Sequence, residues 1–324
     1  MRYIAGMEFS DIVLGTDVYG SDMEQAQAFR MLDAYTAAGG NVLDTAHIYG
    51  RVDERELQLS EHTIGAWMKA RNNRNRVHIC TKGGHPNPAA MQISRLSREE
   101  IQADMEDSLR ALGTDHVELY YLHRDDEALP VDGIIETLAD LVKAGKTRAY
   151  GLSNWKAERV KAADRYAFAH GLPRPAASQI QFSLAQANAR DIDPTLVMLD
   201  EREGGYYAQS AVPVFAFASQ AKGYFAKLAA GGPEALSEKA AVRYDNTVSR
   251  MRFSRAAEVA YRMEKPVSQV ALSSLLQIPV FSVLPIIGCK TETQLADSLA
   301  AAEVQLDAET LTYIWRGVGS PVLG

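Results

Sequence analysis

Short runs of apolar residues alternate with helical patterns along the whole chain. A run of four to eight apolar residues bounded by turn residues is typical of a buried parallel strand, and apolar residues at every third or fourth position are typical of a helix that covers one. An eighth strand is expected near Ile12–Gly15. The other seven segments that fit the strand pattern are 41–46, 77–83, 117–123, 147–154, 177–183, 212–218 and 282–288.

Several expected helices have recognisable ends. The helix with its apolar stripe from Ile134 is predicted to end at Gly145, and the helix after Ser97 at Gly113. The stretch 218–246, rich in Gly, Ala and Lys, is expected to be a long loop with some helix. A Ser or Thr followed three positions later by Glu or Gln fits a capping box, which satisfies free backbone groups at a helix start. Three pairs have this spacing: Ser21 with Glu24, Ser97 with Glu100 and Thr291 with Gln294.

Eight strand and helix alternations without a Pro-, Ser- or Gly-rich linker predict an α/β protein with a single closed (β/α)8 TIM barrel. We expect one domain over residues 1–324. In such barrels the carboxyl ends of the strands meet at one mouth, where functional side chains gather. Polar residues at the strand ends are therefore the candidates for chemistry.

Composition and charge narrow the class of protein. The chain is 47% hydrophobic and has a formal net charge of −7, which argues against nucleic-acid and anionic-membrane partners. Cys80 and Cys289 lack the spacing of a zinc or redox motif, so we expect two buried, reduced thiols. With neither a signal-peptide pattern nor an apolar run of about 18 residues, the expected location is the cytoplasm. The sequence does not predict the oligomeric state.

Two familiar kinds of site do not fit. The chain has no GxGxxG fingerprint, and "AGKT" at 144–147 lacks the first glycine of a phosphate loop, a position occupied by Asp140. Asp44 with His47, or His123 with Asp125, could begin a metal site of a barrel hydrolase. The remaining strand ends offer poor ligands for a divalent cation, so no metal is expected: Lys82, Ser153, Asn154 and Gln179.

Four strand-end residues make chemical sense together. Asp44 ends the second strand with Tyr49 just beyond it, Lys82 ends the third and His123 the fourth. A phenol titrates near pH 10, and we expect the Lys82 ammonium to lower that value. A buried lysine needs a carboxylate to stay charged, and Asp44 supplies it. The set predicts a tuned acid, Tyr49, with His123 beside it to orient a substrate oxygen and assist proton transfer.

The motifs around these residues resemble those of the aldo-keto reductase family from about Gly15 to Thr310. The similar segments are "GGNVLDTAHIYG", "TKGG", "LHRDD", "GLSNW" and "IIGCKTETQLADS". The resemblance implies reversible NADPH-dependent reduction of an aldehyde or ketone to an alcohol, with Tyr49 as general acid, Asp44 and Lys82 as its tuning pair and His123 as the substrate-orienting group.

The resemblance also implies an extended NAD(P)H across the barrel mouth. Ser153, Asn154 and Gln179 would bond the nicotinamide carboxamide, and Phe217 would stack on its ring. Lys290, beside a capped helix start, offers a cation and backbone donors to a phosphate. The resemblance implies that this is the adenosine 2′-phosphate, so NADPH is favoured over NADH; an asparagine common in the family is Ser298 here. Further cofactor contacts are expected from Thr16, Ser219, Gly288 and Gln294.

The substrate is less constrained. Asp17 stands where the family often has tryptophan, "RVDERELQL" extends the segment after Tyr49, and Arg124 and Asp125 follow the histidine. With His47 and His85 nearby, these residues predict a polar mouth suited to a sugar or sugar-like aldehyde or ketone, a small-molecule carbonyl substrate. Three alternatives stay open: a reductase of aromatic or aliphatic aldehydes, an NADP(H)-sensing binding module with little turnover, and a metal-dependent barrel hydrolase.

Overall fold

The strands follow the order of a closed barrel of eight parallel strands, β10-β3-β4-β5-β6-β7-β8-β9, in a computed structural model that describes residues 1–50, 58–188 and 193–317. The (β/α)8 fold class is therefore confirmed. Each strand lies within a segment that the apolar runs predicted: β3 (Val13–Gly15), β4 (Val42–Asp44), β5 (His78–Gly83), β6 (Val117–Leu122), β7 (Thr147–Ser153), β8 (Ala177–Gln181), β9 (Val214–Phe217) and β10 (Val283–Ile287).

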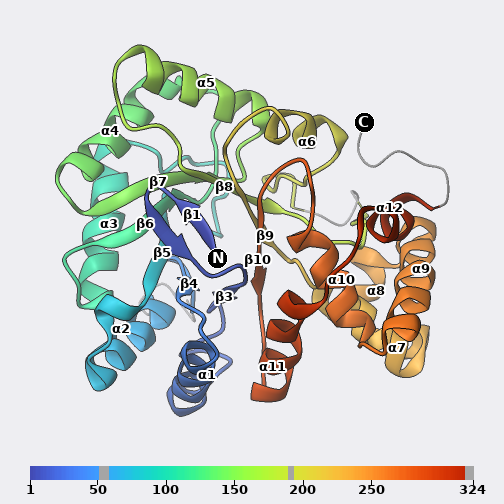
Figure 1. The fold of residues 1–324 in the computed structure, drawn as a ribbon. Helices are drawn as coiled ribbons and strands as arrows, with labels where there is room; N and C mark the ends of the chain where they lie inside the picture. The colour runs from blue at the N-terminus through green and yellow to red at the C-terminus, as the bar shows by residue number, and fades with distance from the viewer. Residues whose placement is uncertain (51–57, 189–192, 318–324) are drawn as a thin grey trace. The chain divides into compact units, whose positions relative to one another are not determined.

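The chain divides into two compact units, 1–180 and 181–324, and the single domain over 1–324 stays a prediction. In the first unit, helices lie outside the strands (Figure 1). They are α1 (Gln25–Ala37), α2 (Leu59–Arg71), α3 (Arg98–Leu112), α4 (Val131–Lys143) and α5 (Ala157–Ala169), with a 3-10 turn η1 (Arg74–Arg76). An antiparallel hairpin of β1 (Arg2–Ile4) and β2 (Met7–Phe9), which the sequence did not predict, precedes β3.

The expected helix ends are partly confirmed. The Ser97 side chain accepts the Glu100 N–H at the start of α3, and Gly113 ends that helix in the left-handed region at φ 64°. The predicted capping box at Ser21 is wrong. The N-cap of α1 is Glu24, and the Ser21 hydroxyl instead donates to the Val18 carbonyl, because this segment forms a turn before the helix begins.

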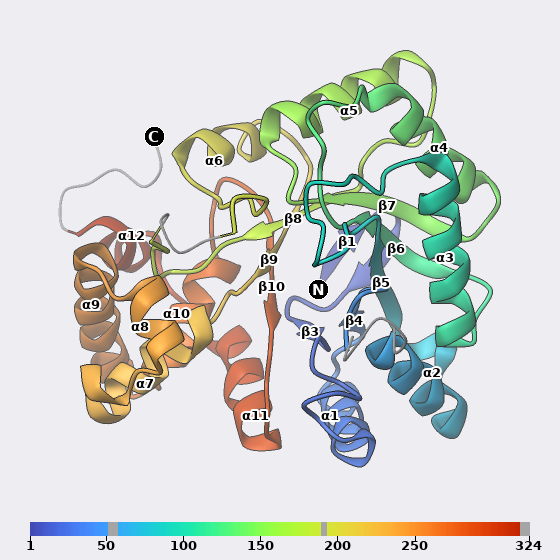
Figure 2. The ribbon, with the colours of Figure 1, turned by 180° about the vertical axis from the view of Figure 1, so that it is seen from behind.

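In the second unit, β9 and β10 pair in parallel. Stretch 218–246, expected to be a long loop with some helix, is largely helical, because Tyr224, Phe225 and Tyr244 are buried apolar anchors. Helix α9 packs against α10 and α12 (Figure 2). The helices of this unit are α6 (Glu201–Tyr207), α7 (Tyr224–Gly231), α8 (Glu238–Tyr244), α9 (Thr247–Met263), α10 (Val267–Leu276), α11 (Glu292–Ala300) and α12 (Ala308–Arg316), with 3-10 turns η3 (Ala221–Gly223), η4 (Pro233–Ala235) and η5 (Ala301–Glu303).

Candidate active site

Lys82, near the end of β5, is the centre of the site in the first unit. Its side chain is fully buried, and its Nζ donates to Asp44 Oδ2 at 2.7 Å, to the Thr45 carbonyl at 2.7 Å and to Tyr49 Oη at 3.1 Å. Asp44 is the last residue of β4, and its other oxygen accepts Gln179 Nε2 at 2.8 Å. The strand ends thus bring Asp44, Lys82 and Tyr49 into one hydrogen-bonded network, as predicted.

Burial and ion pairing together set the charge states of Lys82 and Asp44. Burial acts to lower the pKa of Lys82, but the Asp44 carboxylate and Tyr49 outweigh it and leave the pKa above its usual value. Burial raises the pKa of Asp44, and the Lys82 ammonium and the Gln179 hydrogen bond oppose that rise. Lys82 is therefore an ammonium at neutral pH, the charge state that a donor to Tyr49 needs.

Tyr49 differs from expectation in its pKa. The Lys82 ammonium lies 4.5 Å from the centre of its ring and bonds its hydroxyl. Burial nevertheless raises the pKa of Tyr49 above its ordinary value, Lys82 only partly offsets that rise, and the Asp44 and Asp17 charges add to it. The expectation that lysine would bring the phenol below its usual pKa is wrong in this structure. At neutral pH the phenol is protonated, as a general acid must be.

His123 lies immediately after β6 with its ring edge-on to Tyr49, at 5.7 Å between centroids and 78° between planes. Burial, the Lys82 ammonium and Arg124 hold the pKa of His123 well below its usual range, so the imidazole is neutral at physiological pH. Its Nδ1 is buried and has no hydrogen-bond partner in the part of the chain that the structure describes. A neutral imidazole carries one N–H donor and one acceptor, which suits it to hydrogen-bond a carbonyl oxygen.

The polar residues expected near the nicotinamide in the first unit lie at the same strand ends. Asn154 Nδ2 donates to the His123 carbonyl and to Ser153 Oγ, each at 3.2 Å, and the Asn154 N–H donates to the Gln179 carbonyl. Asn154 has φ 57°, in the left-handed region that asparagine tolerates. The Thr16 hydroxyl donates to the Asp44 carbonyl at 2.9 Å. These residues are brought together; their cofactor roles stay predictions.

In the second unit, the residues expected near the cofactor follow the ends of β9 and β10. Ser219 Oγ donates to the Ile286 carbonyl at 2.6 Å. Lys290 is exposed, and its backbone N–H donates to Gln294 Oε1 at 2.8 Å. Thr291 caps α11, as its spacing with Gln294 predicted. Phe217 ends β9 half-buried, and Gly288 is exposed directly after β10.

Ser298, at the family's asparagine position, is bonded inside the second unit. Its hydroxyl donates to the Gln294 carbonyl and contacts Gln220 Nε2, each at 2.8 Å. Gln220 follows β9, so this contact joins the segment after β9 to α11. At the position where the family often has asparagine, Ser298 therefore connects α11 to the segment after β9.

The residues expected at the substrate differ in their surroundings. Asp17 is exposed, and Arg124 Nη1 donates to the His123 carbonyl at 2.8 Å. Both oxygens of Asp125 accept hydrogen bonds from Arg159, each at 2.9 Å, so this carboxylate is engaged within the protein. The extension after Tyr49 falls mainly on 51–57, outside the described residues.

The described ranges were also compared with the patterns of metal ligands, disulfides and membrane-spanning helices. These contain no group of three or more His, Cys, Asp or Glu residues arranged to hold a metal ion. Cys80 and Cys289 are buried and form no disulfide. Within the same residues, no helix is both long enough and apolar enough to span a bilayer.

The sequence interpretation missed two features beside the site. One is Glu61, a fully buried carboxyl in α2, which accepts a hydrogen bond from Thr81. Its signal was present, because Glu61 is three and seven positions before Ile64 and Met68 and so shares their apolar helix face. The other feature is an ion pair of Asp104 with Arg95, at 2.6 Å, next to the loop after β5. Nothing in the local pattern indicates that these residues meet.

In this barrel a buried lysine bonds a tyrosine that lies beside a neutral histidine. This arrangement is typical of the class of oxidoreductases that act on carbonyl or alcohol groups. The model of the Aldo/keto reductase family matches residues 11–316, and the chain belongs to this family. It therefore uses a nicotinamide cofactor and acts on small carbonyl or alcohol groups, as its family does.

Relatives of the chain are similar over most of their length. An uncharacterized oxidoreductase, YrpG, of Bacillus subtilis is 29% identical, with 95% of this chain and 92% of that protein covered. The norsolorinic acid reductase stcV of Emericella nidulans is 26% identical over 96% of this chain and 79% of that protein. The NADP(+) aryl-alcohol dehydrogenase of Phanerodontia chrysosporium is 26% identical over 95% of this chain and 82% of that protein.

Proposed function

We propose that the protein reduces an aldehyde or ketone to an alcohol with NADPH, and that Tyr49 is the general acid. The observation that carries the proposal is the hydrogen bond from Lys82 Nζ to Tyr49 Oη, backed by the Lys82 to Asp44 ion pair. When bound, NADPH supplies a hydride to the carbonyl carbon. Tyr49 gives its proton to the carbonyl oxygen, and Lys82 stabilises the phenolate that remains.

His123 and Asp44 support that proton transfer in different ways. The neutral His123 imidazole donates an N–H to the carbonyl oxygen and holds it near the Tyr49 hydroxyl. Asp44 keeps Lys82 charged, because removing its carboxylate would leave a buried, unpaired ammonium. In the reverse direction Tyr49 accepts the alcohol proton instead.

The residues present fit a nicotinamide dinucleotide. Ser153, Asn154 and Gln179 bring a hydroxyl and two amides to neighbouring strand ends, the chemistry that complements a carboxamide. Exposed Lys290, beside the capped start of α11, offers a point charge for the phosphate that distinguishes NADPH from NADH. NADP(+) in the name of one relative supports the same choice.

Aromatic carbonyls are the first candidate substrate class, and sugar-like carbonyls the second. Aryl-alcohol dehydrogenases and a norsolorinic acid reductase are among the relatives, which supports an aromatic carbonyl. The pairing of Asp125 with Arg159 removes one of the carboxylates from which a polar mouth was inferred. Exposed Asp17 still favours a hydroxylated substrate and keeps that class in the comparison.

The test is NADPH consumption by wild type and Tyr49→Phe against aromatic aldehydes, aldoses and keto-sugars. We expect Tyr49→Phe to lose activity by about a hundredfold or more while NADPH binding, followed by fluorescence, is retained. Tyr261→Phe is the matched control, since this tyrosine is 87% exposed. Full activity of Tyr49→Phe would refute the acid role. Tight NADPH binding without turnover of any carbonyl would favour the sensing module, and activity lost to chelators the hydrolase.

A further inference from the structure

Two glycines follow Lys82 directly: Gly83 ends β5, and Gly84 is the first residue after it. A Cβ on Gly83 would lie 1.9 Å from the Tyr120 hydroxyl, so only glycine fits there. Gly84 has φ 69°, in the left-handed region that glycine adopts without strain. The Gly83 carbonyl accepts the His123 N–H at 2.8 Å. The left-handed backbone of Gly84 and this hydrogen bond therefore place the next residue, His85, close to His123.

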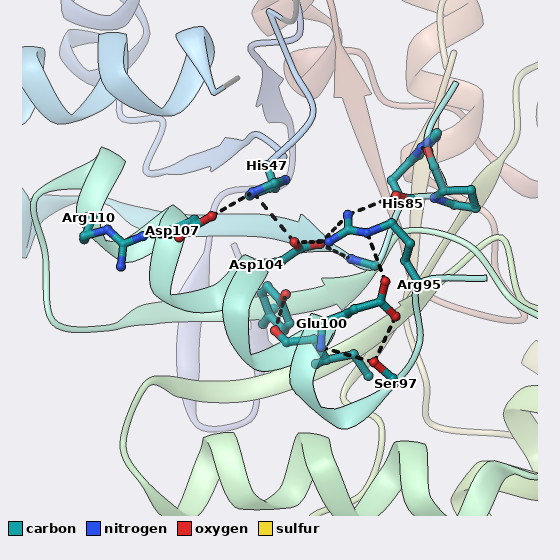
Figure 3. A network of polar contacts seen from close by, with 12 residues as sticks. His47, His85, Arg95, Ser97, Glu100, Asp104, Asp107 and Arg110 are labelled. Atoms are coloured by element: carbon teal, nitrogen blue, oxygen red, sulfur yellow. Dashed lines mark hydrogen bonds and ion pairs between the residues drawn. The ribbon is translucent and has the colours of Figure 1, made fainter. Parts of the chain in front are cut away.

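One buried carboxylate holds both sides of His85. Asp104, in α3 and 2% exposed, accepts the Gly84 N–H at 2.8 Å and the Arg95 guanidinium at 2.6 and 3.1 Å. Arg95 Nη1 also donates to the His85 carbonyl at 3.2 Å. The backbone groups before and after the His85 side chain are thus bound to a single ion pair, the Asp104–Arg95 clamp (Figure 3).

The clamp sets the position of an imidazole against the catalytic histidine. The His85 ring lies edge-on to the His123 ring, at 4.7 Å between centroids and 75° between planes. His85 Nδ1 lies 2.6 Å from the Pro86 carbonyl, and since a carbonyl can only accept, Nδ1 is the protonated nitrogen. With its backbone and one ring nitrogen held, His85 has little freedom to rotate.

His123 needs such a neighbour because its own ring lacks the usual hydrogen-bonded anchor. A catalytic histidine is commonly oriented by a hydrogen bond at its second nitrogen, yet Nδ1 of His123 is buried with no partner among the described residues. The rings of Tyr49 and His85 both contact it edge-on. Packing against these rings therefore determines where the His123 N–H points.

We propose that Asp104, acting through Arg95 and the Gly84–His85 backbone, is a positioning residue that orients His123 for the carbonyl. The proposal rests on the proposed function, in which His123 holds the carbonyl oxygen. His47 lies on the far side of the same carboxylate, with its Nε2 3.8 Å from Asp104, too far for a hydrogen bond (Figure 3). His47 is two residues before Tyr49. Asp104 therefore lies between the segment that carries Tyr49 and the loop that places His85 against His123.

The experiment compares Asp104→Asn, Arg95→Met, His85→Ala and His85→Phe with Arg98→Met. Arg98 also forms an ion pair from α3, but with exposed Asp140 and away from the loop, so it is the matched control. For each variant kcat and KM for the best carbonyl are measured with the NADPH Kd. The Hε1 NMR signal of His123, assigned with His123→Gln, reports its ring position without turnover.

We expect Asp104→Asn, Arg95→Met and His85→Ala to lower kcat by about tenfold to a hundredfold with an unchanged NADPH Kd. His85→Phe should keep most activity, because it preserves the ring edge. Asp104→Asn added to His85→Ala should cause no further loss, since both act through one contact. Losses that multiply, or a His85→Ala variant with wild-type kcat, would overturn the proposal.

Absent turnover in wild type and Arg98→Met would contradict the proposed function, and the NMR signal then decides on the positioning role by itself. We expect Asp104→Asn and Arg95→Met to move the His123 Hε1 signal in the same direction, and Arg98→Met to leave it in place. A signal that stays in place in Asp104→Asn would refute the positioning role, whatever the activity.

Discussion

Among single residues, Glu61 is unusual because its carboxyl group is fully buried inside the first unit. Its Oε1 accepts from Thr81 Oγ1 at 2.5 Å, and its Oε2 has no hydrogen-bond partner among the described residues. Burial raises the pKa of Glu61 to about 7, although the Thr81 hydrogen bond, the nearby Ser108 hydroxyl and the Lys82 charge act to lower it. Since alternate strand residues face opposite sides, Thr81 directs this interaction away from Lys82.

Replacing this group should change how stability depends on pH. The folded pKa of Glu61 is about 7, against an ordinary 4.5, so its contribution is fully present below about pH 4.5 and is lost as pH rises through about 7. Relative to wild type, Glu61→Gln should gain roughly 3 kcal/mol between pH 4.5 and 8. Urea unfolding at several pH values measures this, with exposed Glu234→Gln as control. Parallel pH curves for wild type and Glu61→Gln would contradict it.

The sequence predicts which charges meet at the strand ends, but it does not predict how far those charges are removed from water. The juxtaposition of Lys82 with Asp44 and Tyr49 was predictable, because strand ends converge in a barrel and a buried lysine needs a carboxylate. The pKa direction of Tyr49 was not, because it depends on how far surrounding side chains exclude water. The ion pair of Asp125 with Arg159 was missed for another reason, because the two residues are 34 positions apart and Arg159 lies in α5, away from the strand ends.

At the scale of the element, prediction succeeded where apolar runs were continuous. All eight barrel strands fall within predicted segments because strands buried on both faces are rich in apolar residues, although β5, β7 and β8 also carry polar ones. The N-terminal hairpin was missed because β1 and β2 have only three residues each and mix charged with apolar side chains. The amount of helix in 218–246 was underestimated, because the Gly, Ala and Lys residues of the stretch obscured the buried anchors Tyr224 and Phe225.

The last residue of β5, Gly83, has no room for a side chain. Gly83→Ala should destabilise the protein by about 1–3 kcal/mol, because the new methyl overlaps the Tyr120 hydroxyl and the segment must shift. Gly133→Ala is the opposite case, since Gly133 lies in α4 and no atom of the described residues is within 4 Å of its Cβ position, so the variant should be more stable by about 0.5–1 kcal/mol. Urea unfolding measures both. Equal midpoints for the two variants would show that Gly83 tolerates a side chain.

At the scale of the whole molecule, the two compact units carry different parts of the proposed chemistry. The first unit contains the candidate acid and its supporting groups, Asp44, Tyr49, Lys82 and His123. The second contains the exposed lysine expected at the cofactor phosphate, Lys290. Changes in the second unit should therefore alter cofactor choice and leave the proton transfer intact.

Lys290→Met tests this division. Without the ammonium, kcat/KM for NADPH should fall by about tenfold, because a charged contact to phosphate is lost, while the value for NADH should hardly change. Steady-state kinetics with both cofactors measure the effect, and Lys239→Met, which removes an exposed lysine of α8, is the control. An equal loss with both cofactors would argue against a phosphate contact at Lys290.

The enclosure of Lys82 has a chemical consequence for work with the protein. Its ammonium has no exposed surface and bonds three oxygens, those of Asp44, Thr45 and Tyr49. Reagents that acylate amines need an accessible, unprotonated nitrogen, so they will modify exposed lysines such as Lys290 long before this one. The amine on which the proposed catalysis depends is shielded from acylation as long as the first unit stays folded.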